Sequence, residues 1–247
     1  MTGTDTGVGK TVLAGAIVAA LRARGIAVRV LKPVITGLGH PDHPDHPDHP
    51  DHPDHPDHPD HPDHPDPRWP PDHELLGRAA GCPPDQVALC RYNAAASPHL
   101  AAALAGEQID PDRLRRRILA AASDGEVLVV EGVGGLLVPL ADGYDVRQLA
   151  CELALPLLIA ARPGLGTINH TLLTLEAARA ARLSIAGVIL TPWPEIPSPV
   201  QRSNRETIER LGSVPVATLP HVARAEPGLL AAAGECLGLE RLLAGSL

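Results

Sequence analysis

Hydrophobic and polar residues alternate along this chain with two different periods. In several segments the apolar residues recur three and four positions apart, which predicts amphipathic helices. These helices cover residues 10–24, 74–80, 98–105, 111–122, 147–153, 169–182 and 199–211. Between them, short runs that are apolar throughout predict buried strands at 26–31, 126–131, 157–161, 185–191 and 214–219.

The alternation of these apolar strands with helices indicates an α/β fold. Strands without a polar face must be covered on both sides, so we expect a mostly parallel central sheet between two helical layers. Ligands of such sheets bind beyond the carboxyl ends of the strands. The polar motifs of this chain follow those ends, and we therefore expect one site there.

Residues 40–66 interrupt the pattern with nine copies of His-Pro-Asp. Proline at every third position blocks a helix and disfavours a strand, so we expect an extended, solvated and disordered insertion. Its histidines would instead chelate Zn²⁺ or Ni²⁺ if two segments bent together. Removing the 27 repeat residues from the 247 leaves 220, a length that suits a single domain.

Charge and cysteine content narrow the functional class. The repeat contributes nine Asp, so the formal net charge of −8 becomes +1 without it, which argues against a nucleic-acid binder. No apolar run approaches about 18 residues and no signal peptide is visible, so no membrane segment is expected. The cysteines show no close spacing, which is typical of a reduced, cytoplasmic protein; they are Cys82, Cys90, Cys151 and Cys236.

The segment 7–11, Gly-Val-Gly-Lys-Thr, carries the ending of a phosphate-binding loop. Its glycines let backbone N–H groups converge on a phosphate, and the following helix N-terminus adds partial positive charge. Lys10 would neutralise the β- and γ-phosphates, and the Thr11 hydroxyl would bind Mg²⁺. The sequence therefore predicts a P-loop NTPase-like fold. The loop is one residue longer than the common motif, because its first glycine is Gly3.

The strand that normally precedes such a loop is apparently missing, since only Met1 and Thr2 stand before Gly3. That strand would be central in the sheet and paired on both sides. Its loss would leave backbone groups of its neighbours unpaired inside the core. We therefore expect a reading frame that continues upstream of Met1, which the upstream codons would reveal.

Two carboxylates are candidates for completing a Mg²⁺ site with Thr11, because Mg²⁺ prefers oxygen ligands. Glu131 ends a buried apolar strand directly before glycines, where a carboxylate is costly unless it has a function. Asp72 stands just before the helix at 74–80, and it could equally be the N-cap of that helix.

Five motifs stand in a characteristic order along the chain. They are the loop at 2–11, Lys-Pro-Val-Ile-Thr-Gly at 32–37, Ser-Pro-His at 97–99, Val-Glu-Gly-Val-Gly-Gly at 130–135 and Gly-Thr-Ile-Asn-His at 166–170. Together they resemble the dethiobiotin synthetases over positions 2 to about 221. The lengthened phosphate loop is itself a trait of that family.

The resemblance implies ATP- and Mg²⁺-dependent closure of a urea ring on 7,8-diaminopelargonic acid with CO₂ or bicarbonate, a step of biotin biosynthesis. One amine captures CO₂ as a carbamate, the carbamate takes the γ-phosphate, and the second amine expels phosphate from the mixed anhydride. Two anions must meet, so the protein supplies positive charge and alignment. The resemblance also implies a homodimer, in which the segment around Asn169 reaches the partner's site.

The resemblance further assigns roles to single residues. The expected catalytic residues are Lys10 and Lys32, and the expected metal ligands are Thr11, Asp72 and Glu131. The expected substrate-binding residues are Thr6, Thr36, Ser97 and Asn169. The expected nucleotide-binding residues are Gly7, Val8, Gly9, Lys10, Thr11, Val12, Asp72, Glu131, Gly132, Val133, Gly134, Thr191, Pro192, Leu219, Pro220 and His221.

One position departs from the family pattern. Thr191, followed by Pro192, stands where the family usually has an Asn that reads the adenine edge. A hydroxyl or a backbone carbonyl discriminates bases less strictly than an amide does. We therefore expect a weaker preference for ATP over other nucleoside triphosphates.

Three other functions share features with this pattern. A cobyrinic-acid-type amide synthetase shares the loop but needs a glutaminase domain, for which the chain has no room. A partitioning-type ATPase switch needs a second lysine early in the loop, and residues 3–6 contain none. An inactive homologue is the third alternative, and only an assay separates it from an active enzyme.

Overall fold

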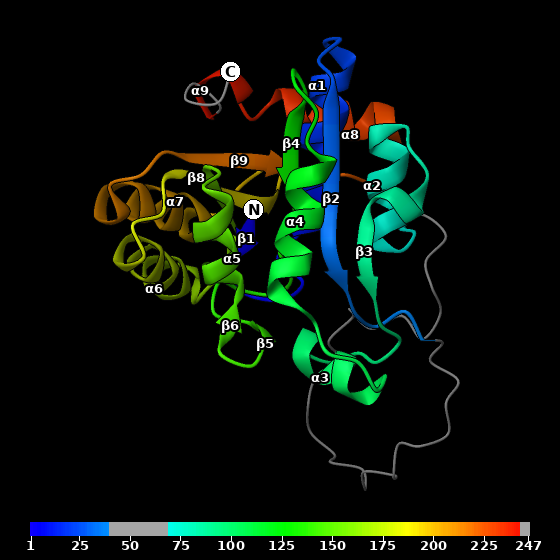
Figure 1. Ribbon diagram of the computed structural model, residues 1–247. Helices are drawn as coiled ribbons and strands as arrows, with labels where there is room; N and C mark the ends of the chain where they lie inside the picture. Colours follow the sequence, from blue (N-terminus) through cyan, green and yellow to red (C-terminus); the bar gives the residue numbers. More distant parts are fainter. Residues whose placement is uncertain (40–68, 243–247) are drawn as a thin grey trace, which may run out of the picture.

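The computed structural model describes residues 1–39 and 69–242 (Figure 1). The predictions for the His-Pro-Asp repeat at 40–66 lie outside the described residues. Within the described ranges, no helix is both long enough and apolar enough to cross a bilayer. Strands and helices alternate along the described chain, as the hydrophobic pattern predicts.

The strand pairs of the central sheet are parallel, which confirms the predicted α/β class. They form two hydrogen-bonded groups, in the orders β3-β2-β4 and β1-β7-β8-β9, and β5 and β6 form a separate antiparallel pair. The strands are β1 Thr2–Gly3, β2 Val28–Ile35, β3 Ala88–Arg91, β4 Val127–Val130, β5 Pro139–Ala141, β6 Tyr144–Asp145, β7 Leu157–Ala161, β8 Ile185–Trp193 and β9 Val216–Pro220.

Helices cover both faces of these strands, with α4 in front of the sheet and α1 behind it in Figure 1. One core cluster joins α1, α2 and α8, a second joins α4 and α5 with β2 and β4, and a third joins α6 and α7 with β7 and β8. The helices are α1 Lys10–Ala23, α2 Asp72–Ala80, α3 Pro98–Leu104, α4 Pro111–Ala121, α5 Val146–Leu153, α6 Thr167–Ala180, α7 Pro199–Gly212, α8 Pro227–Glu235 and α9 Leu239–Leu242, with a 3₁₀ turn η1 at Pro84–Gln86.

The strand predicted at 26–31 is observed as β2 at Val28–Ile35, so Lys32 lies inside this strand rather than after its end. The Lys32 N–H donates to the β3 side at 2.9 Å, whereas the Leu31 carbonyl accepts from the β4 side at 2.8 Å. Since successive residues of a parallel strand face opposite neighbours, Pro33 faces the side on which β4 has already ended. Its missing N–H therefore interrupts no ladder, and the strand continues through it.

The first strand is not wholly missing, which corrects the expectation from the sequence. β1 is a stub of two residues that pair with Ile159 and Ala160 of β7. On its other side, the Met1 ammonium donates to the Val130 carbonyl at 2.7 Å, and the Met1 carbonyl accepts from the Gly132 N–H at 2.9 Å. This stub is the part of the described chain that links the two strand groups at their carboxyl ends.

Candidate active site

The carboxyl ends of β1, β2 and β4 open on a cavity of about 750 Å³. In Figure 1 the arrowheads of β2 and β3 point to this side of the molecule, toward α3. The phosphate loop forms one wall, and the segments after β2 and β4 form the others. The predicted site residues in its lining are Thr6, Gly7, Gly9, Lys10, Thr11, Val12, Lys32, Thr36, Asp72, Ser97, Glu131, Val133 and Gly134.

The phosphate loop needs glycine at position 9 for two reasons. Gly9 has a φ of 86°, in the left-handed region, directly before α1. A Cβ at this position would also lie 3.0 Å from Cγ2 of Thr191. Gly9 caps α1 without a side-chain hydrogen bond within the described chain, so the first N–H groups of the helix are open to an anion.

Lys10 and Lys32 are the only two lysines of the sequence, and both line this cavity. They are 7% and 6% exposed. A buried ammonium group is costly unless it faces negative charge or acceptors. Burial lowers the pKa of Lys10 below its ordinary value, against the attraction of Glu131. Burial acts on Lys32 as well, but the charges of Glu131 and Asp72 outweigh it and raise the pKa of Lys32.

The Lys32 ammonium lies at the centre of a cluster of oxygen atoms. It donates to Oε1 of Glu131 at 2.8 Å and to the Asp72 carboxylate, and it lies 3.4 Å from Oγ1 of Thr11. The Thr11 hydroxyl donates to the same Glu131 oxygen at 2.8 Å. The structure thus brings the three predicted metal ligands together around one cation.

The side chain of Asp72 is not an N-cap, so that interpretation of this residue is wrong. Asp72 is the first residue of α2, and Pro71 occupies the capping position. No side-chain hydrogen bond caps this helix within the described residues. The Asp72 carboxylate instead forms an ion pair with Lys32, which holds it at the cavity.

The oxygen atoms of this cluster fit a Mg²⁺ ion. Glu131 is 0% exposed, and its Oε2 atom has no hydrogen-bond partner among the described residues. A buried carboxylate oxygen without a partner is costly, and a cation would satisfy it. Two carboxylates and a hydroxyl are also a typical protein contribution to Mg²⁺, which takes its other ligands from water and phosphates.

The predicted substrate-binding residues separate into two places. Thr6, Thr36 and Ser97 line the cavity. The Ser97 hydroxyl lies 3.1 Å from Nδ1 of His99, and it makes no capping bond to α3 in the described chain. Asn169 is different, because it lies in the first turn of α6, is exposed to solvent and is not part of the lining.

The residues predicted to bind the nucleotide base gather at the ends of β8 and β9. Trp193 pairs with Pro220, and the His221 N–H donates to the Trp193 carbonyl at 3.2 Å. Thr191 is 3% exposed, and its side chain packs against the backbone of the phosphate loop at Gly9. The predicted residues that lie outside the cavity lining are Val8, Gly132, Thr191, Pro192, Leu219, Pro220 and His221.

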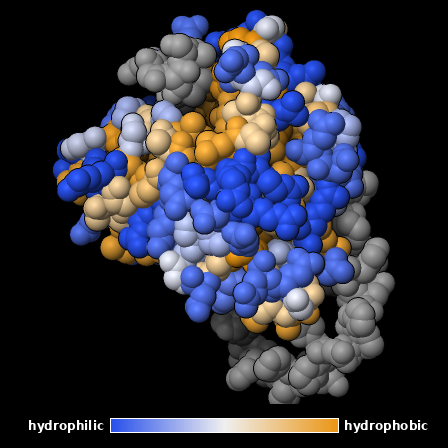
Figure 2. All heavy atoms as spheres, in the orientation of Figure 1, coloured by the Kyte–Doolittle hydropathy of each residue, from blue (hydrophilic) through white to orange (hydrophobic). Residues whose placement is uncertain are grey.

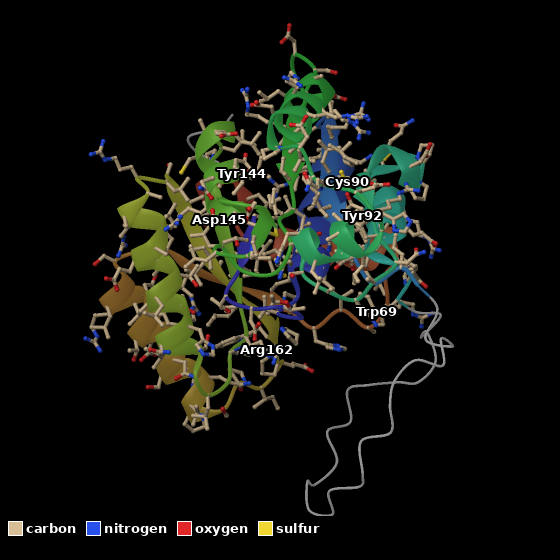
Figure 3. All side chains as sticks on the ribbon, turned by 60° about the horizontal axis from the view of Figure 1, so that its bottom comes forward. Trp69, Cys90, Tyr92, Tyr144, Asp145 and Arg162 are labelled. Atoms are coloured by element: carbon tan, nitrogen blue, oxygen red, sulfur yellow. The ribbon has the colours of Figure 1, made fainter. Side chains whose placement is uncertain are left out.

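The structure adds residues in or beside the cavity that were not among the predicted site residues. Ile35 and Val138 give it an apolar border, and Val138 belongs to the segment between β4 and β5. Arg162, directly after β7, donates to the Thr6 carbonyl at 3.3 Å and lies beside the phosphate loop (Figure 3). The position of Arg162 directly after a predicted strand could have indicated this placement, because the carboxyl ends of the strands border the site.

Comparisons with known proteins point to one family. A family model described as an AAA domain matches residues 1–227. The chain is 35% identical over 245 residues to the ATP-dependent dethiobiotin synthetase BioD of Haloferax mediterranei, which is 98% of this chain and 91% of that protein. It is 40% identical over 227 residues to the protein of the same name from Mycobacterium avium, which is 91% of this chain and 87% of that protein.

A third relative of the same name, from Mycobacterium bovis, is 37% identical over 235 residues, 94% of this chain and 91% of that protein. The family model covers residues 1–227, a range that includes every residue of the cavity lining. The chain belongs to the ATP-dependent dethiobiotin synthetase family.

Proposed function

We propose that this protein closes a urea ring on 7,8-diaminopelargonic acid with CO₂ and ATP, releasing dethiobiotin, ADP and phosphate. Membership of the family supports the reaction. The observation that carries the assignment of the site is the convergence of the phosphate loop, both lysines and two carboxylates on one cavity. A reaction between a carbamate and a nucleoside triphosphate needs this concentration of positive charge.

Lys10 is the residue that meets the phosphates. Its ammonium now donates to the Asp5 carbonyl at 2.8 Å. A phosphate oxygen is charged, and it is a stronger acceptor for an ammonium group than a neutral carbonyl is. ATP bound on the loop therefore draws Lys10 toward its terminal phosphates, in a site that already excludes most water.

Thr11, Asp72 and Glu131 are the residues that would hold Mg²⁺. When bound, the ion supplies positive charge to the phosphate oxygens and reduces their repulsion of an incoming anion. The two carboxylates then have a second cation to neutralise them. The ammonium of Lys32 then becomes available to the carbamate oxygen.

The other end of the cavity suits the diamine. The hydroxyls of Thr6, Thr36 and Ser97 offer acceptors for its two amines, and Ile35 and Val138 offer apolar contact for its carbon chain. Holding both amines on one side of the carbamate carbon lets the second amine attack without a protein nucleophile.

A homodimer is part of the proposal. Leu165, in the loop before α6, is 91% exposed, and Leu173 on the same helix is 56% exposed. Exposed large aliphatic side chains on this segment are available for contact with another protein surface. A second copy that covered them would bring Asn169 from one protomer toward the cavity of its partner, which explains why Asn169 lies outside its own cavity.

The test is ADP release from purified protein with each component omitted in turn. The proposal predicts turnover that requires both 7,8-diaminopelargonate and bicarbonate. ATP hydrolysis at the same rate without the diamine would favour an ATPase switch instead. No diamine-dependent ADP from a folded preparation would leave the inactive homologue as the better interpretation.

A further inference from the structure

Arg162 is a charged residue beside the active-site cavity that none of the roles described so far includes. It follows β7 directly, and its side chain is exposed to solvent (Figure 3). Its Nη2 atom donates to the Thr6 carbonyl at 3.3 Å, and it lies 3.2 Å from the position that a Cβ of Gly7 would take. Thr6 and Gly7 line the cavity and Arg162 does not, so the guanidinium group lies against their peptide bond from outside that lining.

The backbone that follows Arg162 is anchored by a buried amide group. Asn204 of α7 is 7% exposed, and its Nδ2 atom donates to the carbonyls of Pro163 and Gly164, both at 3.0 Å. Moving the loop would leave this buried amide group without partners, which is costly. The anchor therefore fixes where the chain leaves β7, and the exposed side chain of Arg162 starts from a firmly held backbone.

The orientation of the peptide between Thr6 and Gly7 determines which group the loop presents to a phosphate. This peptide is trans, and in a trans peptide the C=O and N–H groups point in opposite directions. Since the Thr6 carbonyl faces Arg162, the Gly7 N–H points to the side of the cavity. It makes no hydrogen bond within the described part of the chain, so it is open to a phosphate oxygen.

Gly7 is the residue that would let this peptide turn over. Its φ is 68°, and half a turn of the peptide would carry φ into the negative range, which glycine adopts about as readily. The turned peptide would present the Thr6 oxygen, with its partial negative charge, to the phosphates. Lys10 holds the neighbouring Asp5 carbonyl at 2.8 Å, but that bond is lost when the nucleotide draws Lys10 to its phosphates. The bond from Arg162 can remain, because Arg162 lies outside the cavity lining.

We propose that Arg162 is a positioning residue of the active site, whose hydrogen bond to the Thr6 carbonyl keeps the Gly7 N–H turned toward the phosphates of the bound nucleotide. The inference rests on the proposed function only in that the loop holds a nucleoside triphosphate. Apparent affinity falls in proportion to the fraction of the protein that is ready to bind. A tenfold bias toward one orientation needs about 1.4 kcal/mol, which is within the range of a hydrogen bond to a charged group.

The experiment measures the rates at which AMP-PNP with Mg²⁺, a ligand that is not turned over, binds to and leaves the full-length protein. Arg162→Met keeps an unbranched apolar stem but removes the charge and the donors. Its affinity is expected to fall about tenfold through slower association with unchanged dissociation, because only the correctly oriented loop accepts the nucleotide. Arg162→Lys should recover most of the affinity, since an ammonium also donates to a carbonyl. The matched control is Arg116→Met on α4, an exposed arginine outside the cavity lining on a helix with a hydrophilic outer surface (Figure 2), and it should bind as the wild type does.

Wild-type affinity in Arg162→Met would overturn the proposal. So would a loss that appears as faster dissociation, because Arg162 would then contact the nucleotide directly. A loss that disappears between about 0.05 M and about 0.5 M salt would also overturn it, because long-range attraction of the nucleotide would then be the cause. These measurements need no diamine, so a wild-type protein that binds AMP-PNP but forms no dethiobiotin would contradict the proposed function alone.

Discussion

At their carboxyl ends, β2 and β4 border a polar cavity in which Lys32 is held by Glu131 and Asp72. Further back along the sheet, β4 and β7 border a second, mostly apolar cavity of about 380 Å³, which we call the strand slot. In the first region Lys32 pairs with two carboxylates and Lys10 donates to a backbone carbonyl. Oε2 of Glu131 has no hydrogen-bond partner among the described residues, and a metal ion would satisfy it. In the second region the side chains are mostly apolar, and the exception is Glu126, whose Oε2 atom has no hydrogen-bond partner among the described residues.

The two regions therefore contribute to different properties of the protein, the first to catalysis and the second to stability. The first cavity is lined by the phosphate loop, which follows β1, and by residues at the ends of β2 and β4. The strand slot contains none of the predicted catalytic or metal-binding residues, so changes there should alter stability first and turnover only as a consequence.

The largest expected effect is on the cavity side of this comparison. Lys10→Ala removes the charge that meets the phosphates, and kcat/KM should fall by about 10³-fold, or roughly 4 kcal/mol. Tm should change little, because Lys10 is bonded only to a loop carbonyl. Arg22→Ala on the same helix is the matched control for loss of one positive charge. Loss of folding in Lys10→Ala would show that the two regions are not separable.

Glu131→Gln tests whether Glu131 is a ligand of the metal ion. The amide keeps the shape of the side chain but removes its charge, and kcat/KM should fall by about 10²-fold or more. The Mg²⁺ concentration needed for half-maximal activity should rise as well, because an amide is a weaker ligand than a carboxylate. The control is Asp124→Asn, an exposed carboxylate far from the cavity lining. An unchanged Mg²⁺ requirement would contradict the role of Glu131.

The amino group of Met1, which lines the strand slot, predicts a pH dependence of the free energy of unfolding. Burial lowers the pKa of the Met1 amino group from 8.0 to about 6, despite attraction from Glu131. Between pH 6 and pH 8 the unfolded chain therefore binds more protons than the folded one, and stability rises with pH. Two pKa units correspond to about 2–3 kcal/mol, a cost present in full below pH 6 and relieved above pH 8.

Denaturant unfolding of the form that begins at Met1, measured at pH 6 and pH 8, tests this dependence. An N-terminally acetylated form is the control, because it removes the charge and keeps the rest of the chain. Burial also lowers the pKa of His73, which gives a slope of the same sign in both forms, so the difference between the forms isolates Met1. Identical pH profiles of the two forms would place the amino group in solvent.

The smallest expected effect concerns the nucleotide base. The Thr191 side chain is buried against the phosphate loop, so it is poorly placed to read a base edge. We expect kcat/KM values with CTP and ATP to agree within about tenfold, or 1.4 kcal/mol. Thr191→Val exchanges the hydroxyl for a methyl group of similar size and should leave their ratio unchanged. A preference for ATP above about 100-fold, roughly 2.7 kcal/mol, would contradict this prediction.

The sequence predicts those parts of the molecule that local chemistry specifies. The helix after the phosphate loop is confirmed as α1, because Gly9 and the apolar spacing after Lys10 act locally. Asp72 stayed ambiguous, since an N-cap and a cavity carboxylate both stand at the start of a helix. Its partner Lys32 lies 40 residues away, and only the fold brings the two together.

Other features escaped prediction because they depend on tertiary contacts. β3 consists of four residues that include Cys90 and Arg91. It is too short and too polar to show the hydrophobic pattern from which a strand is predicted. β2 passes through Pro33 because β4 has ended there, which the sequence of β2 alone does not reveal. The slot is a property of β4 and β7 jointly, and neither strand is unusual by itself.

The central claim is that this chain joins a carbon atom from CO₂ to both amines of the diamine at the expense of ATP. The most direct measurement is mass spectrometry of the product formed from 7,8-diaminopelargonate, Mg-ATP and ¹³C-bicarbonate, with Lys10→Ala in parallel. The account predicts dethiobiotin that carries the heavy carbon, with ADP formed in equal amount, and almost none from the variant. ADP without labelled dethiobiotin from the folded wild-type protein would contradict it.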